Sequence, residues 1–130
     1  MLTDVEYAKV KQTFDYMHSI FKPTDEPVIF ESHEHWEDPK YLMHQLETGH
    51  ISGGAKVYAL ACRSILSKAK VPNRIAFCKT EEGTDHLVCE AEGWILDSRQ
   101  VRLRSWGELP YKWIKISGYS IGEPWHEIAV

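Results

Sequence analysis

The stretch "DHLVCEAEGWILDSR", residues 85–99, reads as two short strands joined by a tight turn. Glu92 and Gly93 suit a two-residue hairpin turn. In the register that this turn sets, the side chains of His86 and Asp97 are diagonal neighbours on one face, close enough to meet. A carboxylate beside an imidazole fixes the tautomer of the ring and stabilises the imidazolium. The pair is therefore either two members of a nucleophilic triad or a His and an Asp on a solvated face.

The second half of the chain predicts an antiparallel sheet around this hairpin. Its segments are short, rich in β-branched and aromatic residues, and separated by turns that contain Gly or Pro. Three helical patterns precede them. The expected helices cover 4–21, 39–47 and 53–69, and the expected strands contain "RIAFCKT" (74–80), "DHLVCEA" (85–91), "WILDSR" (94–99) and "YKWIKISG" (111–118). Helices followed by an antiparallel sheet predict one α+β domain over residues 1–130.

Capping residues mark the ends of the first two expected helices. Thr3 and Glu6 form a capping-box pattern at the start of the first helix. Asp38 suits the N-cap of the second helix, with Pro39 in its first turn, where a missing N–H is tolerated. Gly49 suits the C-terminal cap of the second helix.

The third expected helix begins within "HISGGAKVYALACRSIL", residues 50–66. Gly53 and Gly54 allow the backbone to approach another group where the helix dipole is positive. A cysteine nucleophile is often placed at such a point, because a helix N-terminus lowers the pKa of the thiol. Here the residue is Ala55, so the stretch is either an active site without its nucleophile or an ordinary helix start. Cys62 lies two turns further along, and we interpret it as a buried structural thiol.

Composition narrows the class of protein. The 130 residues are 43% hydrophobic and carry a net charge of −4, so we expect a soluble globular domain with no nucleic-acid partner. No apolar run approaches a membrane span, and the charged N-terminal residues do not resemble a secretory signal, so no membrane partner is expected. The three cysteines, Cys62, Cys78 and Cys89, lack CxxC spacing. Free buried thiols in a reducing, cytoplasmic compartment are therefore expected.

Four segments in order carry a family resemblance. They are "HWEDPKYLM" (35–43), "GGAKVYA" (53–59), "DHLVCEAEGWILD" (85–97) and "LPYKWIKISG" (109–118). Their order resembles that of the bacterial transglutaminase-like cysteine peptidases, whose pattern runs from a "YW-x-T-P"-like stretch through "GDCEDYA", "GHAVL" and "W-x-LD" to "PYxW". The resemblance implies a papain-like or transglutaminase-like core, with N-terminal helices packed on an antiparallel sheet.

The resemblance also implies a role for each matching position. The family's cysteine falls on Ala55, its histidine on His86 and its aspartate on Asp97. In the family the thiolate attacks an amide carbonyl, the histidine transfers the proton and the aspartate orients the ring. We expect His86 and Asp97 to be hydrogen-bonded, with the Ala55 methyl group facing the imidazole. The backbone amide at the helix start would hold the oxyanion. Gly54 lies at that helix start, and Trp36 and His50 are further candidates to line the cleft.

Two departures from the family pattern matter. Ala55 has no nucleophilic atom, so the chain as written is expected to be catalytically inactive, and an engineered Cys-to-Ala knock-out is favoured over natural loss. Gly54, Lys56 and Val57 replace the acidic residues that flank the family's cysteine. Calcium requires several oxygen ligands, so no calcium is expected here.

No other metal or cofactor is expected. The stretch "ESHEHWED", residues 31–38, contains His33 and His35 among acidic residues. Imidazoles and carboxylates suit zinc or manganese, but no partner motif with ligand spacing accompanies them. We interpret this stretch as a solvated acidic loop.

The leading hypothesis is a small thiol hydrolase, a cysteine peptidase or amidase acting on a peptide or protein, here without its nucleophile. The resemblance implies a bacterial or phage origin. A second hypothesis is a natural pseudoenzyme that binds a peptide or protein in the old cleft. A third is a peptidoglycan-cleaving amide hydrolase, because cell-wall cross-links are also amides.

Overall fold

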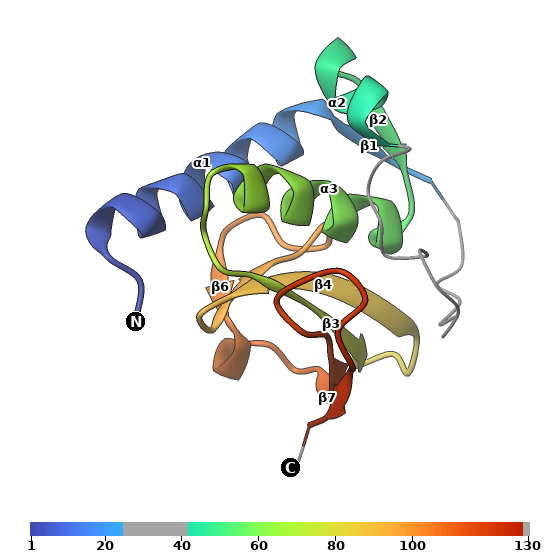
Figure 1. The fold of residues 1–130 in the computed structure, drawn as a ribbon. Coiled ribbons are helices and arrows are strands. Elements are labelled where there is room, and N and C mark those ends of the chain that lie inside the picture. Colours follow the sequence, from blue (N-terminus) through green and yellow to red (C-terminus); the bar gives the residue numbers. More distant parts are fainter. Residues whose placement is uncertain (25–41, 129–130) are drawn as a thin grey trace.

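The computed structural model describes residues 1–24 and 42–128. The elements within these residues are α1 (Asp4–Ile20), β1 (Phe21–Pro23), α2 (Met43–Thr48), β2 (Ile51–Gly53), α3 (Ala55–Lys68), β3 (Arg74–Lys79), β4 (Asp85–Ala91), β5 (Trp94–Leu96), β6 (Arg104–Ser105), the 3-10 helix η2 (Trp106–Glu108), β7 (Lys112–Ile116) and β8 (His126–Glu127). Helices α1 and α3 lie on the same side of the sheet (Figure 1). The predicted α+β class is confirmed.

The sheet has six strands in the order β6-β5-β4-β3-β7-β8, and each neighbouring pair is antiparallel. The tight turn at Glu92 and Gly93 pairs Ala91 with Trp94, as the sequence predicted for this hairpin. A separate parallel pair, β1 with β2, was not expected. Strands β6 and β8 were also missed, because two residues are too few to show a strand period.

The helix boundaries follow the capping chemistry. Glu6 donates its backbone N–H to the Thr3 hydroxyl at 3.1 Å, and Thr3 donates its own to the Glu6 carboxylate at 3.0 Å, which confirms the capping box of α1. Gly49 caps α2 in the left-handed conformation with φ 74°, also as predicted. The expected start of that helix at Asp38 and Pro39 lies outside the described residues.

Alternation along β4 divides the buried side chains between the two faces of the sheet. Leu87, Cys89 and Ala91 belong to the main core, which includes residues of α1 and α3. Val88 belongs to a second cluster that includes Tyr111. His86 shares the side of Val88, because side chains two residues apart in a strand point to the same face.

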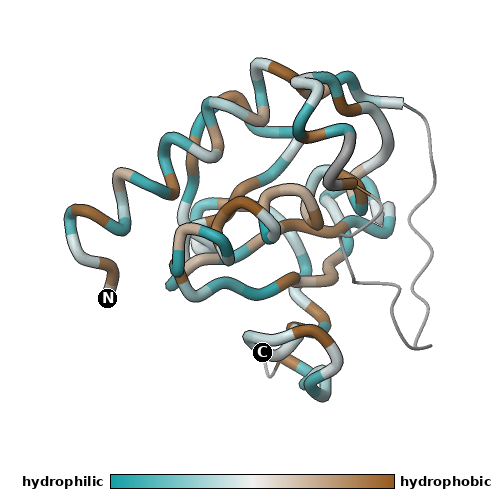
Figure 2. The backbone as a smooth tube through the Cα atoms, turned by 45° about the horizontal axis from the view of Figure 1, so that its top comes forward, coloured by the Kyte–Doolittle hydropathy of each residue, from teal (hydrophilic) through white to brown (hydrophobic). Residues whose placement is uncertain are grey.

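Hydrophobic and hydrophilic residues alternate along α1 (Figure 2), as expected for a helix with one buried side. Its buried side includes Val10, Phe14 and Met17. Among the described residues, no helix combines the length and the apolar character needed to cross a bilayer.

Candidate active site

The predicted pair of His86 and Asp97 is present in the structure. His86 is the second residue of β4, and Asp97 directly follows β5. The Nε2 atom of His86 lies 2.7 Å from Oδ1 of Asp97. Both residues are buried, with 4% and 0% of their surface exposed. The interpretation as a solvated surface pair is therefore wrong.

Three donors surround the Asp97 carboxylate. Oδ1 also accepts the backbone N–H of Arg99 at 2.9 Å, and Oδ2 accepts the hydroxyl of Tyr111 at 2.5 Å. Burial raises the pKa of Asp97, but the hydrogen bonds from His86, Tyr111 and Arg99 outweigh burial and hold that pKa below its ordinary value. Asp97 is therefore an anion at neutral pH.

The hydrogen bond to Asp97 also defines which nitrogen of His86 is available. An ionised carboxylate only accepts, so Nε2 carries the proton that is donated to Asp97. Within residues 1–24 and 42–128, Nδ1 of His86 makes no hydrogen bond. In a neutral ring Nδ1 is then the basic nitrogen, as general-base catalysis requires.

Ala55 is the first residue of α3 and is half-buried. Further along this helix, Arg63 donates to the hydroxyl of Ser117, which also accepts the N–H of Ile75. Ile75 and His86 lie toward opposite ends of the antiparallel β3–β4 pair. The N-terminus of α3 therefore points toward the end of the sheet that carries His86.

A second observation agrees with this orientation. Tyr58, three residues after Ala55, is buried. Burial, Cys62 and the Asp97 carboxylate all raise the pKa of the Tyr58 hydroxyl, so Asp97 lies near this part of α3. His86 is on the sheet side of Val88, and its ring hydrogen-bonds Asp97 and packs against Tyr111; among the described residues no hydrogen bond or ring contact joins it to the N-terminus of α3. That the Ala55 methyl group faces the imidazole stays a prediction.

The residues before Ala55 show why glycine is needed there. Gly53 has φ 157°, and a Cβ at this position would lie 2.6 Å from Cγ2 of Val57. The close approach predicted for this turn is thus present at Gly53. Gly54 is the buried N-cap of α3 with an ordinary φ of −87°, and its carbonyl accepts the N–H of Tyr58 at 3.2 Å.

The other expected cleft residues are not joined to the pair by the described contacts. His50 is exposed and precedes β2. Trp36 lies outside the described residues, as do His33 and His35. Within the described ranges, no group of three or more His, Cys, Asp or Glu side chains is placed to hold a metal ion.

The three cysteines are free and buried, as predicted. Burial raises the pKa of all three thiols, that of Cys78 to about 12. A neutral buried thiol is a poor nucleophile, so Cys62, Cys78 and Cys89 are structural.

Tyr111 is a site residue that sequence reasoning did not identify. It precedes β7, is 8% exposed, and contacts Asp97 through its hydroxyl and His86 through its ring. The sequence held one signal for it, the "PYKW" segment within the family resemblance. The hydrogen-bonding role of the tyrosine was not apparent from that segment.

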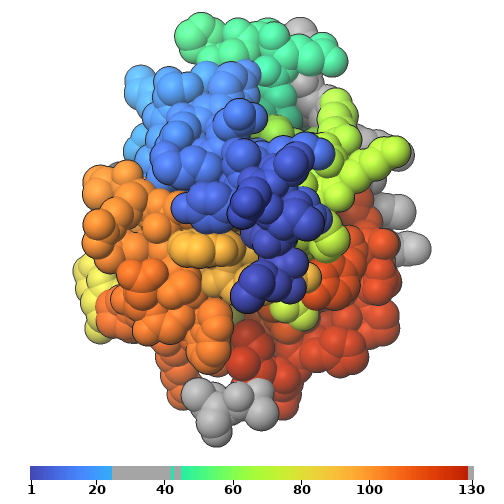
Figure 3. All heavy atoms as spheres, turned by 90° about the vertical axis from the view of Figure 1, so that its left-hand side faces the viewer, coloured from blue at the N-terminus to red at the C-terminus, as the bar shows by residue number. Residues whose placement is uncertain are grey.

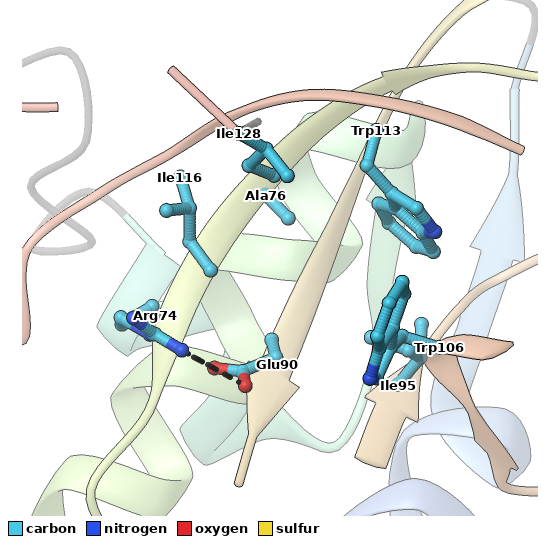
Figure 4. Close-up of a pocket in the computed structure, with 8 residues that line it drawn as sticks. All are labelled: Arg74, Ala76, Glu90, Ile95, Trp106, Trp113, Ile116 and Ile128. Atoms are coloured by element: carbon cyan, nitrogen blue, oxygen red, sulfur yellow. Dashed lines mark hydrogen bonds and ion pairs between the residues drawn. The ribbon is translucent and has the colours of Figure 1, made fainter. Parts of the chain in front are cut away.

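A separate apolar groove of about 270 Å³ lies on the sheet side away from α3. Figure 4 shows Trp106 and Trp113 on one side of it and the Arg74–Glu90 ion pair on the other. Arg74 Nε lies 3.0 Å from Glu90 Oε1. Val88 lies between Glu90 and His86 along β4, so the groove is distinct from the His–Asp pair.

Comparison with solved structures finds the same fold in LapG of Legionella pneumophila. The calcium-bound form matches with a TM-score of 0.67, a second LapG structure with 0.68, and the EGTA-treated form with 0.69. Each is 16% identical, and the matches cover 93%, 94% and 95% of this chain and 68% of the LapG chain. No family model and no curated protein sequence matches. LapG is a transglutaminase-like cysteine protease of bacteria, and the chain shares its fold.

Proposed function

We propose that this chain is a small thiol hydrolase of the transglutaminase-like peptidase type, which acts on an amide bond of a peptide or protein and lacks its nucleophile here. The observation that carries the proposal is the buried 2.7 Å hydrogen bond between His86 and Asp97, with Nδ1 of the ring unengaged among the described residues. The fold shared with the cysteine protease LapG supports it.

Each residue has a defined part in this chemistry. A cysteine at position 55 would give its proton to Nδ1 of His86, and its sulfur would attack the amide carbonyl. His86 would then protonate the leaving amine, while Asp97 stabilises the imidazolium. Water would hydrolyse the thioester and release the acid. Ala55 supplies no sulfur, and the three native thiols are buried, so the chain as written is inactive.

A natural pseudoenzyme is the second candidate, and Ala55 itself is the observation that favours it. If the alanine is natural, the cleft would bind a peptide or protein without cleaving it. The two candidates differ in one measurable property. A peptidase that has lost only its sulfur still activates a thiol placed at position 55, whereas a cleft that has diverged as a binding site does not.

The test is the variant Ala55→Cys. We expect the new thiol to ionise below the free-cysteine value of about 8.5. The pKa is obtained from the rate of iodoacetamide labelling measured at a series of pH values from acid to alkaline, with the labelled peptide identified by mass spectrometry. The new thiol should react ahead of Cys62, Cys78 and Cys89.

Two controls isolate the cause. Ser52→Cys places an exposed thiol on β2, outside the helix, and should titrate normally. Ala55→Cys combined with His86→Ala should lose the low-pKa thiolate, because the imidazolium that stabilises it is absent. An Ala55→Cys thiol that titrates like the Ser52→Cys thiol would reject the hydrolase and favour the pseudoenzyme.

A further inference from the structure

The geometry points to Tyr111 as a positioning residue of this site: its hydroxyl anchors Asp97 and its ring limits the orientation of His86, so that Nδ1 of His86 stays available to a group at position 55. The catalytic part of this inference, that His86 is positioned to accept a proton from a group at position 55, rests on the proposed function. The contacts that support it are independent of what occupies position 55.

The Tyr111 hydroxyl donates its proton to the Asp97 carboxylate. Arg99 Nη1 and Gln100 Nε2 each lie 3.2 Å from the Tyr111 oxygen, and both groups are donors only. A phenol has one proton, so with two donors at its oxygen the proton points to Oδ2 of Asp97 at 2.5 Å. A charged acceptor makes this one of the stronger hydrogen bonds of the site.

The Tyr111 ring makes the second contact. Its centroid lies 5.6 Å from that of His86 with an interplanar angle of 80°, and 5.7 Å from that of Trp113 with an angle of 62°. Both are edge-to-face contacts, the arrangement that aromatic rings prefer. Trp113 is buried in β7, so the Tyr111 ring packs against a residue fixed in the sheet as well as against the imidazole.

The donors to Tyr111 are themselves anchored. Arg99 lies 2.7 Å from Glu81 and 3.2 Å from Glu82, which belong to the turn between β3 and β4. Gln100 accepts a hydrogen bond at its carbonyl from Nε2 of His18 on α1, at 2.6 Å. Figure 3 shows α1, in blue, beside the orange segment around residue 100. The loop after Asp97 is thus fixed to the turn and to α1.

The groups around Asp97 come from several elements. Hydrogen bonds from His86 of β4, from Tyr111 before β7 and from the backbone N–H of Arg99 lower the pKa of Asp97. The Asp97 carboxylate in turn opposes ionisation of Tyr58 of α3, Cys78 of β3 and Glu81 of the turn. Two side chains donate hydrogen bonds to Asp97, those of His86 and Tyr111, and of these the Tyr111 phenol is neutral at pH 7, so its replacement by phenylalanine leaves the protein's charge unchanged. Tyr111→Phe therefore tests the hydrogen bond without altering the surrounding field.

The first experiment follows Asp97 and His86 by nuclear magnetic resonance in the chain that carries Ala55. In Tyr111→Phe we expect the pKa of Asp97 to rise by about one unit, a tenfold change in its acid constant. We also expect the ring nitrogens of neutral His86 to show more of the Nδ1–H tautomer. Tyr119→Phe, at an exposed tyrosine, is the matched control and should change neither. An unchanged Asp97 titration and tautomer in Tyr111→Phe would overturn the inference.

Gln100→Leu is a second test in case Tyr111→Phe does not fold. It removes one of the donors that orient the Tyr111 hydroxyl and leaves Tyr111 itself in place. It should shift Asp97 in the same direction by a smaller amount, and no shift counts against the inference.

The second experiment connects Tyr111 to reactivity. In the Ala55→Cys background, Tyr111→Phe should lower the rate of iodoacetamide labelling near pH 6 about tenfold, equivalent to one pKa unit of the thiol. The control Tyr119→Phe should leave that rate unchanged. An unactivated Ala55→Cys thiol would reject the proposed function, whereas the Asp97 and His86 signals would still decide the role of Tyr111. An activated thiol that is insensitive to Tyr111→Phe would reject the positioning role alone.

Discussion

Asp97→Asn tests the electrostatics of the site through stability. Asp97 is fully buried and accepts from His86, from the Arg99 amide and from Tyr111. Asparagine keeps one oxygen acceptor and replaces the other with an amino group. If the remaining oxygen stays with His86 and Arg99, the amino group faces the Tyr111 hydroxyl, whose oxygen already has two donors.

The expected cost follows from this mismatch. One hydrogen bond to a charged group contributes about 1.5–3 kcal/mol, and the two retained bonds become bonds to a neutral oxygen. We expect Asp97→Asn to lower the free energy of unfolding by about 2 kcal/mol at pH 7. For a domain of 130 residues this corresponds to a fall in Tm of about 8 °C.

The pH dependence has a defined sign. The pKa of Asp97 in the folded protein is below its ordinary value of 3.8, so the stabilisation is complete above that value and is lost as pH falls through the folded pKa. Asparagine does not titrate. The stability difference between the two proteins should therefore be largest at neutral pH and should shrink below about pH 4.

Urea denaturation of both proteins at several pH values measures this difference directly. Val101→Ala, at a largely exposed side chain in the loop after Asp97, is a control that should show no such pH-dependent difference. An Asp97→Asn protein as stable as the parent at pH 7, or a difference that does not change with acid, would refute the account of the Asp97 site.

The contact between His86 and Asp97 was predictable because it depends on a local turn. Glu92 and Gly93 both have positive φ, 50° and 92°, which is the requirement of the hairpin turn that matches strand twist. Once that turn is set, the register of β4 and β5 follows and brings the two side chains to one face. The signal and the contact lie within the same 15 residues.

Tyr111 could not be predicted in the same way. Tyr111 directly precedes β7, which pairs with β3, whereas Asp97 follows β5, on the opposite side of β4 from β3. The register between β3 and β7 also shifts between Phe77 and Cys78. An irregularity of this kind follows from tertiary packing, not from local propensity. The relation of Ala55 to His86 is non-local as well, because it depends on how α3 packs on the sheet.

Two further predictions concern the start of α3 and its surroundings. Gly53→Ala should lower the free energy of unfolding by about 1–3 kcal/mol, because its methyl group would overlap Val57; Gly107→Ala, which meets open space, is the control, and equal urea midpoints for the two variants would contradict the steric explanation. Millimolar calcium should leave Tm unchanged relative to EGTA, although one LapG structure is calcium-bound. Lys56 adds a cation beside Ala55 where the family pattern has carboxylates, and calcium needs several oxygen ligands. Because a ligand that binds the folded state raises Tm by mass action, a calcium-dependent rise would show that other oxygen atoms of this chain form a site.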